Sequence, residues 1–185
     1  LIPRYYDVTK GSVKVDGVDV RDMTQKELRD KLGYVPQKGV LFSGTIDSNI
    51  RYGKPEITDA QVKEAAEVAQ ATEFIDTKPE KYKSPVSQGG TNVSGGQKQR
   101  LSIARAIAKE PEIFIFDDSF SALDFKTDSQ LRKALKEYTK DATTVIVAQR
   151  ISTILGADQI IVLDDGHMAG IGTHKELMAN CEVYQ

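Results

Sequence analysis

Apolar and polar residues alternate near both ends of the chain in the way that is typical of β-hairpins. Near the start, the alternation runs over residues 12–20 around Asp16-Gly17, a dipeptide suited to the positive φ angles of a tight turn. Near the end, it runs over residues 160–171 around Asp165-Gly166. We therefore expect a two-stranded hairpin at each of these places.

Short polar patterns mark the positions where helices begin. Before four of the predicted helices the chain carries a Ser or Thr followed three residues later by Glu or Gln, the pattern of a capping box, in which the two residues bond each other's backbone N–H groups. The four pairs are Thr24 with Glu27, Thr58 with Gln61, Ser94 with Gln97, and Thr173 with Glu176. We expect a helix after each of them, and we expect Pro111 to end the helix that follows Ser94.

Three short apolar runs predict strands. Residues 33–37 form a brief run stopped by a proline, whereas residues 113–116 and 143–148 are continuous runs typical of strands buried on both faces. Apolar positions at helical spacing over residues 131–138 predict a crossover helix between the last two runs. A strand, a helix and a strand at this spacing indicate a parallel sheet.

This order of elements predicts an α/β fold with an inserted lobe. Residues 1–38 and 111–185 supply the sheet-containing core, and residues 39–110 form a mostly helical subdomain. A length of 185 residues fits one domain of this kind, because single domains usually contain ~100–200 residues.

Composition narrows the kinds of partner that the chain can have. With 25 Lys+Arg and 27 Asp+Glu the formal net charge is −2, and no basic block is present, which argues against binding nucleic acid or a membrane surface through bulk charge. A phosphate ligand remains possible. No run approaches the ~18–20 apolar residues of a membrane span, and the single Cys181 cannot form an internal disulfide. We therefore expect a soluble, cytosolic chain.

Polar residues follow the predicted strands at the end where open parallel sheets bind ligands. Asp117 and Asp118 follow one strand, Gln149 follows the next, and Gln37 follows the proline-terminated strand. An aspartate after a buried strand is how nucleotide hydrolases hold Mg²⁺, a cation that prefers oxygen ligands. The alternative is a pair of solvated acids at a strand end.

The segment Ser94-Gly95-Gly96-Gln97 has two interpretations as well. It predicts a plain serine-capped helix, and it also suits an anion, because the unpaired N–H groups of a helix start attract phosphate and glycines allow a close approach. The basic residues farther along this helix predict a solvated face, with assistance to phosphate binding by the first two as an alternative. They are Lys98, Arg100, Arg105 and Lys109.

In combination and in this order, the motifs resemble the nucleotide-binding domain of an ATP-binding cassette (ABC) transporter over essentially the whole chain. The matching segments are Tyr34 to Gln37 (Q-loop), Asn92 to Arg100 (signature motif), Ile113 to Asp117 (Walker B), Ser121 to Asp124 (D-loop) and Gln149 (switch position). The resemblance implies a P-loop NTPase (RecA-like) core with a parallel sheet, an N-terminal β-hairpin and an inserted α-helical subdomain.

The resemblance also implies the cofactors ATP and Mg²⁺ and the residues that hold them. Gln37 and Asp117 are the implied metal ligands. The implied nucleotide-binding residues are Gln37, Ser94, Gly95, Gly96, Gln97, Asp117 and Asp124. In this family two such domains enclose two ATP molecules, each between the Walker motifs of one domain and the signature motif of the other.

Residues 41–50 resemble the segment that follows the Q-loop in exporters. This resemblance implies that roughly residues 37–50, together with the loop at 86–90, contact the coupling helices of a transmembrane domain. It places the chain at the cytoplasmic face of the cell membrane. In the second of these segments Gln88 stands where exporters usually carry a glutamate.

Two positions depart from the family pattern at the implied catalytic centre. Asp118 stands where the family has the glutamate that polarises the attacking water, and its side chain is one methylene, about 1.5 Å, shorter. Gln149 stands where the family has a histidine, and an amide cannot become cationic. Because the signature motif is intact, we hypothesise a degenerate subunit of a heterodimeric exporter, slow at its own site and serving the partner's site.

A P-loop motif, Gly-x-x-x-x-Gly-Lys-Ser/Thr, does not occur in the chain. We expect it just upstream of Leu1, so that the sequence is an N-terminally truncated domain that binds ATP poorly by itself. Two alternatives remain: a non-hydrolytic regulatory ATP-binding module, and a soluble ABC ATPase acting on nucleic acid or ribosomes. The charge of −2 and the exporter-like segment weigh against the second.

Overall fold

The computed structural model describes residues 1–185, which divide into two compact units, Leu1–Val145 and Ile146–Gln185. The larger unit contains the sheet and most of the helices. The smaller unit is built on a hairpin.

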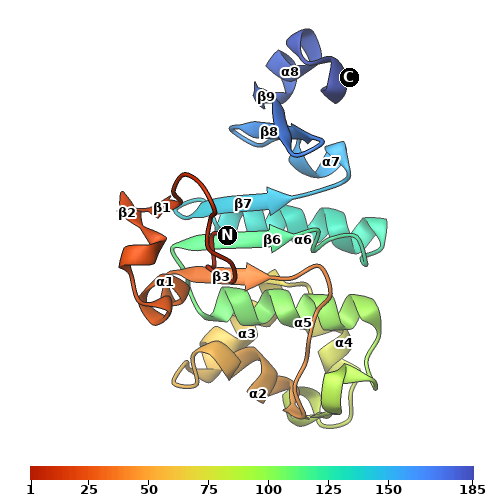
Figure 1. The fold of residues 1–185 in the computed structure, drawn as a ribbon. Coiled ribbons are helices and arrows are strands. Elements are labelled where there is room, and N and C mark those ends of the chain that lie inside the picture. The colour runs from red at the N-terminus through yellow and green to blue at the C-terminus, as the bar shows by residue number, and fades with distance from the viewer. The chain divides into compact units, whose positions relative to one another are not determined.

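The central sheet has three strands in the order β3-β6-β7, with bounds Leu32–Val35, Ile113–Asp117 and Thr143–Val147. Strand β3 pairs with β6 in parallel, from Leu32 opposite Ile113 to Val35 opposite Phe116. The three arrows point the same way in Figure 1. The parallel sheet and the crossover helix α6, Phe125–Tyr138, are as the sequence predicted.

The apolar run of β6 is continuous because the strand lies in the interior of the larger unit. Phe114, Ile115 and Phe116 are all buried, and helix α5, Gly95–Ala108, packs against the neighbouring β3. Strand β3 also lies very close to the turn after α5. A Cβ at Gly33 would lie 2.6 Å from Cγ of Pro111. A larger residue at position 33 would therefore push β3 away from the turn that ends α5.

All four predicted capping boxes form. They precede α1 (Gln25–Asp30), α3 (Asp59–Val68), α5 and α8 (His174–Asn180). Three further short helices were not predicted, namely α2 (Ile46–Ile50), α4 (Thr72–Asp76) and α7 (Ile151–Ile154). Helix α2 does have a box, but its third residue is Ser48 rather than Glu or Gln, so the sequence pattern missed it.

The N-terminal hairpin also forms, from β1 (Lys14–Val15) and β2 (Val18–Asp19). Asp16 and Gly17 both have positive φ, 52° and 80°, as this kind of turn requires. The hairpin is tied to the sheet by a buried cluster of five residues, Val15, Val20, Leu28, Leu32 and Ile115.

Residues 39–110 hold helices α2 to α5 and one short antiparallel pair, β4 (Gly44–Thr45) with β5 (Pro85–Val86). Helix α5 packs against α2, α3 and also β3. Because one helix contacts both the helical segment and the sheet, a separate lobe with boundaries at 39 and 110 stays a prediction.

The smaller unit contains the second predicted hairpin, β8 (Ile160–Asp164) with β9 (His167–Gly172), which pair in antiparallel fashion. Ile160 packs with Leu177, Cys181 and Tyr184 of the C-terminal segment in a small buried cluster. Across the whole structure no helix combines the length and the apolar character needed to cross a bilayer.

Candidate functional site

Two carboxylates and one amide meet at the carboxyl end of β6. Asp117 is the last residue of the strand, Asp118 follows it, and Gln37 lies two residues beyond the end of the paired strand β3. The Nε2 of Gln37 donates a hydrogen bond of 3.1 Å to Oδ2 of Asp118. The structure therefore brings together two residues that are 81 positions apart, as parallel strand ends require.

The turn after β6 holds Asp118 in an uncommon conformation. Its φ is +44°, in the left-handed region, which costs a residue with a Cβ about 1 kcal/mol or more. The next residue stabilises the turn, because the buried Ser119 donates its hydroxyl to the carbonyl of Val35 at 2.8 Å. Ser121 donates in turn to the carbonyl of Asp118 at 3.0 Å. The direction of the Asp118 carboxylate is thus set by bonds to β3 and within the turn.

Tyr34 contacts the first aspartate. Its hydroxyl donates to Oδ2 of Asp117 at 3.2 Å. Burial raises the pKa of the Tyr34 phenol, and the negative charge of Asp117 raises it further. The hydroxyl therefore remains a proton donor at neutral pH. The sequence had indicated no role for this side chain, since a tyrosine in a strand is most simply part of the sheet packing.

The start of α5 is a capped and accessible helix terminus. The N–H of Ser94 donates to Oε1 of Gln97 at 3.1 Å, and the N–H of Gln97 donates to Oγ of Ser94 at 3.2 Å. The N–H groups of Gly95 and Gly96 lie in the first turn, where a helix provides no carbonyl partner. A Cβ at Gly95 would meet nothing within 4 Å, so the backbone is open on that side. This geometry suits an anion.

Asp124 acts as the N-cap of α6. Its side chain accepts a hydrogen bond of 2.9 Å from the N–H of Thr127, and this bond is the main reason that the pKa of Asp124 is lowered. The turn before Asp124 touches the start of α5, because a Cβ at Gly96 would lie 3.4 Å from the carbonyl oxygen of Ala122. The predicted nucleotide contact of Asp124 stays a prediction beside this capping role.

Gln149 is exposed and belongs to the smaller unit. Its predicted approach to Asp117 and Asp118 therefore stays a prediction. Along the chain it lies between β7 and α7, two positions before the helix begins.

The prediction of a solvated basic face is wrong for three of its four residues, Arg100, Arg105 and Lys109. Arg105 donates to the carbonyl of Val40 at 2.9 Å and to the carbonyl and Oδ1 of Asn49 at 2.8 and 2.9 Å. Its guanidinium also lies over the rings of Phe42 and Tyr52. Burial lowers the pKa of Arg105 to about 10, which leaves it charged at neutral pH.

Two other basic residues, one in α5 and one directly after it, bond backbone carbonyls of neighbouring elements. Arg100 donates to the carbonyl of Gln70, just after α3, at 2.6 Å, and Lys109 donates to the carbonyls of Arg29, in the last turn of α1, and Leu32. Cations stabilise helix C-termini in this way. Arg100 is therefore engaged away from the capped start of its own helix.

The two segments predicted to contact a transmembrane domain are joined to each other. Strand β4 pairs with β5, and the N–H of Gly89 donates to the carbonyl of Leu41 at 3.1 Å. Next to them Phe42 stacks on Tyr52 with ring centroids 4.1 Å apart, and Tyr52 is 59% exposed. Residues 41–52 and 85–89 thus form one surface with an exposed aromatic ring.

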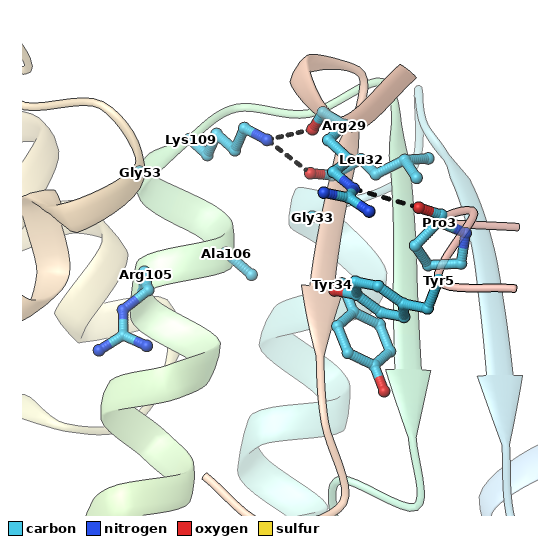
Figure 2. Close-up of a pocket in the computed structure, with 10 residues that line it drawn as sticks. All are labelled: Pro3, Tyr5, Arg29, Leu32, Gly33, Tyr34, Gly53, Arg105, Ala106 and Lys109. Carbon is cyan, nitrogen blue, oxygen red and sulfur yellow. Dashed lines mark hydrogen bonds between the residues drawn. The ribbon is translucent and has the colours of Figure 1, made fainter. Parts of the chain in front are cut away.

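A pocket of about 210 Å³ lies behind Tyr34, between the N-terminal turn, β3 and α5 (Figure 2). Three basic side chains line it, but each donates to a backbone carbonyl of the protein itself. They are Arg29, Arg105 and Lys109. The pocket therefore offers no uncommitted cation to an anionic ligand.

Comparison with known proteins places these features in a family. A family model described as ABC transporter matches residues 1–121. An uncharacterised ABC transporter ATP-binding protein of Mycobacterium bovis is 48% identical over 100% of this chain, and a Staphylococcus aureus protein whose name describes multidrug export by an ATP-binding/permease protein is 46% identical over 100%. The chain spans about a third of the length of these curated relatives, 32% of each.

Among solved structures, an ATP-bound bacterial ABC exporter of the Atm1 family matches with a TM-score of 0.96 and 40% sequence identity. The match covers 99% of this chain and 32% of the exporter chain. The P-loop NTPase fold implied by the sequence is thereby confirmed.

Proposed function

Because this chain belongs to the ABC transporter family and has the fold of an exporter's nucleotide-binding domain, we propose that it binds Mg²⁺ and ATP and powers export across a membrane as part of a longer protein. The observation that supports this most directly is the meeting of Gln37 with Asp118, next to Asp117, at the carboxyl end of β6. It is the arrangement in which a parallel sheet presents oxygen ligands to a metal-bound phosphate.

The residues at this edge fit Mg²⁺ by the chemistry of their donors. Asp117 offers a carboxylate, and Gln37 offers an amide oxygen because its bond to Asp118 uses the nitrogen. A hard cation that retains several waters needs few protein ligands, and these two supply oxygen only. Bound Mg²⁺ would neutralise charge on the phosphates, while Tyr34 holds Asp117 in place through its hydroxyl.

We propose that the start of α5 serves a second nucleotide-binding domain rather than this chain's own metal site. The support is its accessibility: Ser94 and Gln97 satisfy each other, and Gly95 leaves the backbone open. Positive helix-terminal charge and free N–H groups would then hold phosphate on the partner. Asp124, as the cap of the adjoining helix, would fix the turn that touches Gly96.

We also propose that this chain's own site turns over slowly and that its partner is a non-identical subunit. Asp118 is shorter by about 1.5 Å than the glutamate of the family pattern, and a misplacement of ~1 Å can cost about 10²-fold in rate. The positive φ of Asp118 and its bond from Gln37 hold the short side chain where it is. Gln149 can donate a hydrogen bond but cannot take up a proton.

The surface formed by residues 41–52 and 85–89 is our proposed contact with the coupling helices of a transmembrane domain. Its two segments are joined by the β4–β5 pair, so a displacement of either segment would be transmitted to the other. Because only residues 38–40 separate Gln37 from this surface along the chain, the proposal gives the membrane domain a short path to the metal site. The chain would then work at the cytoplasmic face.

The test is the double change Asp118→Glu with Gln149→His in the full exporter, with the partner's own site disabled. We expect ATP turnover at this chain's site to rise by about 10-fold or more, because both departures would be reversed. Asp118→Asn with Gln149→His is the matched control, since the amide cannot polarise water, and it should give no rise. No gain in the first variant would contradict the proposal that these two positions limit turnover.

A further inference from the structure

One buried amide of α5 holds the loop that carries Gln37. The side chain of Gln99 is buried, at 2% exposure. Its Oε1 accepts a hydrogen bond of 3.0 Å from the N–H of Gly39, and its Nε2 donates one of 3.1 Å to the carbonyl of Pro36. Both ends of the amide are therefore used on the two residues that flank the segment Gln37-Lys38.

The loop also lies as close to α5 as backbone packing permits. A Cβ on Gly39 would lie 2.8 Å from Oγ of Ser102 and 2.9 Å from the carbonyl oxygen of Lys98. Only glycine fits at this distance, so the path of the loop is set by the surface of α5. Gln99 fixes the position of the loop along the helix. Its amide accepts a hydrogen bond from Gly39 and donates one to Pro36, so a shift of the loop would break both bonds.

The same helix thus carries two functional elements. Its first turn is the phosphate-type site beginning at Ser94, and its next turn carries Gln99, whose loop places Gln37 3.1 Å from Asp118. Nothing in this arrangement requires Gln99 to touch a ligand. The amide acts through the backbone on either side of Gln37.

We propose that Gln99 is a positioning residue that sets the placement of Gln37 for Mg²⁺ and couples it to the start of α5. This inference rests on the proposed function, in which Gln37 is a metal ligand. Without Gln99, the carbonyl of Pro36 and the N–H of Gly39 lose their partners, and the loop leaves α5. Gln37 then loses its fixed distance from Asp118.

Hydrogen exchange in the complete exporter, without nucleotide or metal, tests the contact itself. Gln99→Met keeps the length of the side chain and removes both bonds, whereas Gln99→Glu keeps the acceptor and removes only the donor. We expect faster exchange at the Gly39 amide in the first variant, by about 10-fold. Ser102→Ala is the matched control on the same face, because that hydroxyl bonds only Lys98 of its own helix. Unchanged exchange in Gln99→Met would overturn the proposal.

Binding of ATP as a function of Mg²⁺ concentration then tests the action on Gln37, with the partner's site disabled. We expect Gln99→Met to raise the half-saturating Mg²⁺ concentration roughly 10-fold, as Gln37→Ala does, and the double variant to be no worse than Gln37→Ala alone. Gln99→Glu should give a smaller rise, and Ser102→Ala none. ATP binding in the presence of a chelator should be unchanged throughout.

The outcomes separate the inference from the proposal beneath it. If Gln37→Ala and Asp117→Asn leave the Mg²⁺ dependence unchanged, the proposed metal site fails. If those two variants shift it but Gln99→Met does not, or if the effects of Gln99→Met and Gln37→Ala multiply, the positioning role of Gln99 is overturned. Should Gln99→Met fail to fold, the Mg²⁺ dependence of ATP binding in Gln99→Glu is compared with that of Gln37→Ala in its place.

Discussion

The two ends of helix α5 differ in the hydrogen bonds that hold them. The side-chain bonds of the first turn are those of its own cap, the reciprocal bonds between Ser94 and Gln97, and Gly95 faces open space. The second half is anchored in its surroundings, because Arg105 and Lys109 donate to carbonyls of other elements. One end is thus free to meet a ligand, and the other is bound to the rest of the larger unit.

One helix can therefore present a candidate site at one end and support the fold at the other. An anion-binding terminus needs unsatisfied N–H groups, which a folded protein normally pairs. The open first turn is tolerable because the remaining turns are buried, with Leu101, Ile103 and Ile107 almost fully enclosed. Changes at the first turn should therefore act mainly on function, and changes in the second half mainly on stability.

The largest effect is expected at the open end, from Gly96→Asp. A carboxylate in the first turn would repel phosphate at the positive helix terminus, and its Cβ would lie 3.4 Å from the carbonyl of Ala122. We expect ATP turnover of the assembled exporter to fall by about 10²–10³-fold. Gly96→Asn is the matched neutral control. An equal loss in the two variants would show that bulk, not charge, is responsible, and would weaken the assignment of this turn as a phosphate site.

At the anchored end, Arg105→Met is expected to destabilise the chain by about 2–4 kcal/mol, because partly buried acceptors on Val40 and Asn49 lose their donors. Urea denaturation measures the change. Arg105→Lys keeps the charge but cannot reproduce the forked geometry, so its loss should be intermediate. A loss in turnover as large as that of Gly96→Asp, under conditions where the variant stays folded, would contradict the division between the two ends.

The anchored end is also where sequence reasoning failed, for a physical reason. Caps and hairpin turns depend on residues a few positions apart, so the four capping boxes and both hairpins could be predicted. Arg105 bonds partners 56 and 65 positions away, and no spacing in the sequence signals such a contact. The helix α4 was missed for a related reason, since it has no side-chain cap and is held by the burial of Phe74 and Ile75.

The candidate metal site was more predictable than the distances in sequence suggest. Gln37 and Asp118 are 81 positions apart, yet both follow parallel strands, and the ends of parallel strands meet at one edge. The pairing of Tyr34 with Asp117 and the hold of Gln99 on the loop were not predictable. They depend on which way a side chain points inside a packed interface, and periodicity alone does not give that.

A smaller effect is expected from the cap of the open end. Ser94→Ala removes the acceptor for the N–H of Gln97 and should lower the free energy of unfolding by about 1 kcal/mol. Ser94→Thr retains the hydroxyl and should recover most of the loss in urea denaturation. If Ser94→Ala destabilised the chain as much as Arg105→Met, the first turn of α5 would contribute as much to stability as the second half. That result would contradict the division between the two ends.

The smallest effect is expected just beyond the anchored end, at Glu110. Its carboxylate accepts hydrogen bonds from Gln61 at 2.9 Å and from Lys54 at 3.1 Å, and these lower its pKa below 4.5. The folded state is therefore favoured while Glu110 is ionised, above that value, and the contribution is lost as the pH falls through the lowered pKa.

Because the side chain is 45% exposed, the Glu110 contribution should be below about 1 kcal/mol and should shrink with added salt. We expect Glu110→Gln to be slightly less stable than the unchanged chain at neutral pH, and the difference to vanish once the pH has fallen below the lowered pKa of Glu110. Glu56→Gln, at an exposed position, is the control. A difference that persisted in acid would mean that Glu110 supports the end of α5 by packing, not by charge.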